Sequence, residues 1–120
     1  MSMMDVVGVG EYRLPDSIDE SRLDLVAEFM AKPRGRHSND LQLLLSRMRS
    51  DRTIGRMLLV RSEDGQGYWM AWSPAKRGDN YRRISLYASR EEAERFAFAI
   101  RWELHTSRVL PGFAGAMPLS

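Results

Sequence analysis

The sequence predicts an α+β domain: a small three-stranded, mainly antiparallel sheet packed with about three helices, with extended N- and C-terminal arms. Two observations predict this class. Apolar residues recur at helical spacing in three segments, and about forty residues between the second and third segments resemble short strands around a hairpin loop. Because 120 residues with 43% apolar side chains suit one domain, we expect an arm (1–15), one domain (16–108) and an apolar arm (109–120).

The first helix is expected to run from about Ser17 to Ala31. Two glycines and Pro15 interrupt the preceding residues, which favours an irregular arm there. Ser17 and Glu20 have the spacing of a capping box, which marks a helix start. The helix has two apolar faces, the main one formed by Leu23, Val26, Ala27 and Met30 and the second by Ile18, Leu25 and Phe29.

The second helix is expected to begin near Ser38 or Asn39 and to stop near Asp51. A linker over residues 32–37 contains a proline and a glycine, which end the first helix and permit a turn. Asn39 with Gln42 is the predicted cap, although Ser38 is also a preferred capping residue. Its buried stripe is predicted to be Leu41, Leu44, Leu45 and Met48.

Three short strands are predicted next. Met57–Val60 is an apolar run, and Tyr68–Trp72 is the return strand after a loop at Glu63–Gly67 whose glycines permit positive φ. Arg83–Tyr87 is the third strand, after a polar loop. The return strand alternates, and one of its sides carries Tyr68, Met70 and Trp72.

The last helix, Ser89–Arg108, is predicted to be apolar on two opposite sides. Ser89 and Glu92 form a capping box at its start. One face carries Ala93, Phe96, Ala97, Ile100 and Leu104, and the other carries Phe98, Trp102 and His105. A small core fills one face, so we expect Phe98 and Trp102 to stay partly exposed in the isolated chain and to be covered by a different protein.

The segment after this helix is expected to be an apolar arm without regular structure. It contains two prolines and two glycines, together with more large apolar side chains than disordered tails usually carry. We expect it to dock in extended form on a partner or on a neighbouring copy. The predicted partner interface comprises Leu25, Phe29, Phe98, Trp102, His105, Leu110, Phe113 and Met117.

The charge is unevenly distributed although the net charge is only +2. Residues 1–31 carry two Arg against seven acids, and residues 32–61 carry eight basic groups against two acids. Arg is well suited to anion contacts and interfaces. A possible anion or nucleic-acid surface therefore consists of Arg47, Arg49, Arg52, Arg56 and Arg61.

No set of residues with enzyme-like spacing is found in the sequence. The chain has two histidines and no cysteine, so neither catalytic nor metal-ligating residues are predicted. The absence of cysteine suits a reducing compartment. No signal peptide or membrane span is expected, and the predicted location is the cytoplasm.

Four short motifs, in order, resemble the small (alpha) subunit of N,N-dimethylformamidase and related proteins between about Ala31 and Glu103. They are Pro33–Ser38, Gly55–Val60 with Tyr68–Ala71, Ser89–Glu94 and Ile100–Glu103. The resemblance implies a non-catalytic subunit of a hetero-oligomeric amide hydrolase. It implies that the iron site belongs to a large catalytic subunit on which this chain packs, and that this chain holds no cofactor.

Two other interpretations remain open from the residues alone. The Arg-rich stretch, followed by aromatic residues that could stack on bases, suits a free-standing nucleic-acid-binding or regulatory module. A homo-oligomer that covers its own apolar faces is the other alternative.

Overall fold

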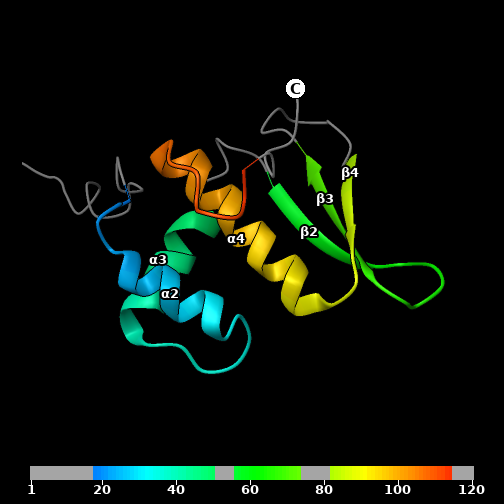
Figure 1. Cartoon of the computed structure of the whole chain (residues 1–120), viewed down its shortest axis with the longest axis horizontal. Coiled ribbons are helices and arrows are strands. Elements are labelled where there is room, and N and C mark those ends of the chain that lie inside the picture. Colours follow the sequence, from blue (N-terminus) through cyan, green and yellow to red (C-terminus); the bar gives the residue numbers. More distant parts are fainter. Residues whose placement is uncertain (1–17, 51–55, 74–81, 115–120) are drawn as a thin grey trace, which may run out of the picture.

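The computed structural model describes residues 18–50, 56–73 and 82–114, and they form the predicted α+β arrangement. The helices are α2 (Leu23–Ala31), α3 (Asn39–Ser50) and α4 (Arg90–Thr106). The strands are β2 (Arg56–Arg61), β3 (Tyr68–Ser73) and β4 (Arg82–Tyr87), in the order β2-β3-β4 with both pairs antiparallel. Figure 1 shows the sheet on one side of α4 and the α2–α3 pair on the other.

The central helix, α4, is buried on both of the faces that its sequence predicts. One face packs on the inner side of the sheet through Ala93, Ala97 and Ile100, which contact Met70 and Tyr87. The opposite face packs on α2 and α3. There the Phe98 ring stacks on Phe29, with centroids 4.4 Å apart, and on Trp102, with centroids 6.1 Å apart.

The prediction that Phe98 and Trp102 stay partly exposed in the isolated chain is wrong. Each is only 1% exposed, because α2 and α3 fold against that face of α4. Leu25 and Phe29 are buried in the same cluster. Complete burial of one large apolar side chain stabilises a fold by about 1.5–3 kcal/mol. Packing of α2 and α3 on this face of α4 therefore stabilises the isolated chain.

The segment after α4 turns back along the helix instead of leaving the domain (Figure 1). Ser107, in the left-handed conformation, ends the helix. Leu110 is buried in the core between the helices, and the Phe113 ring packs edge-on against Phe96 at 4.8 Å. Arg108 pairs with Glu20 at 2.7 Å. Leu110 is therefore not available for the predicted docking on another molecule, Phe113 is half-buried against its own chain, and Met117 lies outside the described residues.

The helix starts differ in part from those predicted. α4 is capped as expected, since Glu92 N–H donates to Ser89 Oγ at 3.1 Å. α3 is capped by Ser38, whose Oγ accepts from Leu41 N–H at 3.2 Å, and not by the Asn39–Gln42 pair. Gln42 donates instead to the His37 carbonyl.

α2 begins at Leu23, later than the predicted start. Asp19 accepts from Ser21 N–H at 3.0 Å, and this local turn competes with helix formation over the preceding residues. The predicted capping residue Ser17 lies outside the described residues.

Candidate partner-interaction surface

The side of the sheet that faces away from α4 is apolar and solvent-exposed. Leu58, Val60 and Leu86 are 46%, 42% and 55% exposed. The strand register places Val60 opposite Trp69, and Trp69 opposite Leu86, so the three side chains form one row across all three strands. We call Leu58, Val60, Trp69, Ala71 and Leu86 the outer sheet face, in which Trp69 is half-buried and Ala71 is buried beside the three exposed side chains.

A charged group borders this surface at β4. An irregularity in the β3–β4 pairing between Met70 and Ala71 brings Arg83 opposite Ala71, and the Arg83 guanidinium lies 4.9 Å from the centroid of the Trp69 ring. Arg83 also forms an ion pair with Glu63 of the hairpin loop. Its hydrogen bond holds the pKa of the Glu63 carboxyl below its ordinary value. An apolar centre with a charged rim is the usual anatomy of a protein–protein interface.

The outer sheet face was missed in the sequence, although a signal was present. A strand with one solvated face alternates between apolar and polar residues, whereas Met57–Val60 has four consecutive apolar residues. Met57 and Leu59 face α4, while Leu58 and Val60 lie on the open side. A continuous run of this kind indicates that both faces of the strand meet apolar surfaces.

The structure places most of the predicted interface residues in the core. Leu25, Phe29, Phe98, Trp102 and Leu110 are buried within the chain, which removes the reason for assigning them to a partner surface. His105 is half-buried on α4, with its Nε2 3.4 Å from the Met48 carbonyl oxygen. Phe113 is half-buried against α4.

The arginines of the predicted anion or nucleic-acid surface are dispersed. Arg47 and Arg49 line different hollows of α3, and Arg56 and Arg61 lie at opposite ends of β2. Arg52 lies outside the described residues. Residues two apart on a helix point in directions about 160° apart, so Arg47 and Arg49 cannot share one contact surface. In the described part of the chain these side chains do not make one basic patch.

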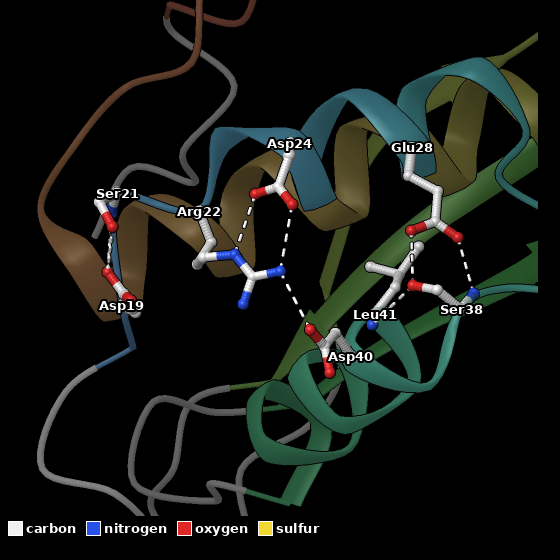
Figure 2. A network of polar contacts seen from close by, with 8 residues as sticks. All are labelled: Asp19, Ser21, Arg22, Asp24, Glu28, Ser38, Asp40 and Leu41. Carbon is white, nitrogen blue, oxygen red and sulfur yellow. Dashed lines mark hydrogen bonds and ion pairs between the residues drawn. The ribbon is translucent and has the colours of Figure 1, made fainter.

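A polar network joins α2 to α3 (Figure 2). Arg22 donates to Asp24 at 3.0 Å and to Asp40 at 3.1 Å. These bonds raise the pKa of Arg22, with Asp24 the larger cause. Glu28 accepts from both the backbone N–H and the hydroxyl of Ser38, each at 2.7 Å. The contacts of Arg22 with Asp40 and of Glu28 with Ser38 cross between the two helices, so the network holds them against each other. The acids of the network are engaged with these donors.

A hollow of about 170 Å³ lies beside this network and is lined by Ile18, Asp19, Arg22, Leu25, Asp40, Leu43, Leu44 and Arg47. Its charged rim is largely taken up by the Arg22 ion pairs. Nothing in its lining provides a nucleophile with an adjacent base.

The described residues contain no recognisable metal centre. Across residues 18–50, 56–73 and 82–114, no group of three or more His, Asp or Glu side chains could hold a metal ion. Within the same ranges, none of the helices has the length and apolar character needed to cross a membrane.

Comparison with known proteins gives one family. A family model described as N,N-dimethylformamidase alpha subunit matches residues 11–109, which includes every described helix and strand. Comparison with curated proteins and with solved structures found no match. The resemblance predicted between Ala31 and Glu103 is thus confirmed and extends beyond both of these residues. Because the match covers most of the chain, this protein belongs to the N,N-dimethylformamidase alpha subunit family.

Proposed function

We propose that this chain is the non-catalytic small subunit of a cytoplasmic, hetero-oligomeric amide hydrolase of the N,N-dimethylformamidase type. In this proposal it packs on a large, metal-bearing catalytic subunit through the outer sheet face and stabilises it. The iron would be held by the large subunit. Family membership supports the subunit role, and the outer sheet face is the observation that supports the docking surface.

Three features favour the outer sheet face over the rest of the surface. The inner side of the sheet and two faces of α4 are already buried within the chain, so they are not accessible to a partner. The outer sheet face joins three strands into one apolar area. Covering its half-exposed Leu58, Val60 and Leu86 would contribute about 1 kcal/mol each.

A charge placed on this surface tests the proposal. We expect Leu86→Glu to reduce recovery of the large subunit with a tagged small subunit by at least about tenfold, because a carboxylate would be buried in an apolar contact. The measurement is co-purification after co-expression of the two subunits from the host of this chain. The isolated variant is expected to unfold at nearly the wild-type temperature, since Leu86 is 55% exposed.

Leu43→Glu is the matched control. Leu43 has the same 55% exposure but lies on α3, away from the sheet. We expect it to leave recovery of the large subunit unchanged. Equal recovery with Leu86→Glu and wild type would overturn the docking surface. Concentration-dependent self-association of the wild-type chain, abolished by Leu86→Glu, would assign the surface to a second copy instead.

A further inference from the structure

The two edge strands of the sheet differ in how well they are protected against pairing with another strand. β3 lies between β2 and β4, so each of these two strands has one open side among the described elements. Native edge strands are usually protected by bulges, charged side chains or a covering segment. β4 has such features, because its pairing with β3 shifts between Met70 and Ala71 and because it begins with Arg82 and Arg83.

The other edge strand, β2, is regular and apolar. Its register with β3 is continuous from Arg56 to Arg61, and the four residues between these two arginines are all apolar. Both of its faces are apolar, since Met57 and Leu59 pack toward α4 and the two residues that alternate with them belong to the outer sheet face. A regular, apolar strand at the edge of a sheet is a template for the addition of another strand.

The hydrogen-bond pattern shows which backbone groups of β2 point to its open side. Directly after the strand, Ser62 N–H donates to the Gly67 carbonyl oxygen at 2.8 Å. Bonded and non-bonded residues alternate along an antiparallel pair. Because the register is regular, every second residue counted back from Ser62 bonds to β3. The residues between them, Met57, Leu59 and Arg61, direct their N–H and C=O groups to the open side.

A contact with α4 agrees with this orientation. Arg101 donates from Nη2 to the Met57 carbonyl oxygen, as expected for a carbonyl that points away from β3. The contact is 3.5 Å long, beyond the usual range of about 2.7–3.2 Å, so it satisfies this carbonyl only weakly. Among the described residues, no hydrogen bond reaches the backbone of Leu59 or Arg61 on the open side. This side therefore presents backbone donors and acceptors at the spacing of a strand.

We propose that an extended segment of the large subunit pairs with the open side of β2 as a fourth strand of the sheet. The inference rests on the proposed function, because it takes the large subunit as the partner. A row of backbone donors and acceptors is matched by another extended backbone, and such main-chain bonds provide the affinity in strand-addition complexes. β2 also contributes Leu58 and Val60 to the outer sheet face, so a partner that covers this face already contacts the edge strand.

The side chains of β2 define the chemistry of the added segment. Side chains of neighbouring strands that lie on the same face of a sheet contact each other. The added strand would therefore place its alternate residues beside Leu58 and Val60 on the outer side. We expect these residues to be apolar, with β-branched or aromatic side chains.

Residue-resolved hydrogen–deuterium exchange, in the isolated chain and in the complex, tests the pairing. We expect the Leu59 N–H to exchange rapidly in the isolated chain and at least about tenfold more slowly in the complex, because it gains a backbone acceptor. The Leu86 N–H is the matched control. Trp69 bonds to β2, so its partner Leu86 directs its N–H to the open side of β4, while its side chain lies on the outer sheet face. We expect no comparable slowing at Leu86.

The other outcomes each overturn the added strand. Equal slowing at Leu59 and Leu86 would mean that the large subunit covers the sheet without pairing. Unchanged exchange at Leu59 in the complex would refute the pairing, and the docking surface would still stand if Leu86→Glu prevents assembly. Slow exchange at Leu59 in the isolated, dilute chain would show that the chain itself covers this edge. Slowing that increases with the concentration of the isolated chain would assign the edge to a second copy. Lack of co-purification with the wild-type chain would overturn the docking surface as well.

A proline on the open side tests the pairing through the strength of assembly. Arg61→Pro removes an N–H that points to this side, and proline is tolerated in edge strands where this group faces solvent. Arg61→Thr removes the same side chain but keeps the N–H. We expect Arg61→Pro to bind the large subunit at least about tenfold more weakly than Arg61→Thr, because an acceptor of the added strand is left without a donor. Equal binding of the two variants would contradict the pairing, and exchange at Leu59 in the wild type decides the case if Arg61→Pro does not fold.

Discussion

Glu28 shows how one carboxylate positions a whole helix. It projects from α2, yet both of its oxygens accept hydrogen bonds from Ser38, the residue that caps α3 (Figure 2). The Ser38 hydroxyl in turn accepts from Leu41 N–H. The start of α3 is thus held to α2 by a series of hydrogen bonds. These bonds restrict the position of α3 relative to α2, and α3 packs on the core in that position.

This contact predicts a pH dependence. The bonds from Ser38, its side chain first and its backbone second, lower the pKa of Glu28 below its ordinary value of 4.5. A depressed folded-state pKa contributes stability above the unfolded pKa, and that contribution is lost as the pH falls through the folded value. We expect Glu28→Gln to unfold at a lower temperature than the wild type at pH 7, and we expect the difference to shrink as the pH falls below the ordinary pKa of 4.5.

Thermal unfolding at several pH values checks this expectation. Glu103→Gln is the control, since Glu103 is half-buried on α4 and no side-chain hydrogen bond is described for it. A Tm difference between Glu28→Gln and wild type that stays constant from pH 7 to pH 3 would contradict the assigned role.

At the scale of elements, α4 is the centre of the fold because it is covered on three sides. The sheet and the α2–α3 pair cover two opposite faces, and the segment after Ser107 covers part of a third. Its two-sided apolar pattern could be read from the sequence. The identity of the covering surface could not, because helical periodicity shows which side chains avoid water but not what they meet.

The segment after α4 is predicted to stabilise the isolated chain. Leu110 is 5% exposed within the helical core, so Leu110→Ala is expected to lower the free energy of unfolding by about 2–3 kcal/mol. Its neighbour Val109 is 49% exposed, and Val109→Ala is expected to change it by no more than about 0.5 kcal/mol. Urea unfolding of the two variants measures the difference. Equal, small effects would mean that this segment does not hold to the core.

The strands illustrate a second limit of sequence-based prediction. The order and the hairpin of β2 and β3 follow from local signals, namely two apolar runs around a glycine-containing loop. The outer sheet face is exposed because none of the described elements forms a second layer over it. Whether such a layer exists depends on where all the other elements of the chain pack, and local sequence signals do not show this. The helices α2 and α3 cover one face of α4, and α4 covers the inner side of the sheet, while none of the described elements packs on the outer side.

At the scale of the whole molecule, the described residues form two cores on either side of α4 and leave the outer sheet face open. The proposed subunit role would account for that combination, since a subunit needs a stable domain of its own and a surface for its partner. The sequence-based family resemblance was carried by short motifs in the correct order. Phe98 and Trp102, with Leu25 and Phe29 that cover them, were assigned to an interface because the apolar surplus of α4 was attributed to a partner, whereas it is buried within the chain.

Selective labelling of an introduced thiol tests the central claim, docking of the outer sheet face on the large subunit, most directly. The chain contains no cysteine, so Val60→Cys and Leu43→Cys each create one labelling position, the first on the outer sheet face and the second on α3. Maleimide labelling of the small subunit is followed by mass, with and without the large subunit. We expect both positions to react readily in the isolated chain and only position 60 to be protected, by at least about tenfold, in the complex. Undiminished labelling at position 60 in the assembled complex, with or without protection at position 43, would contradict the account.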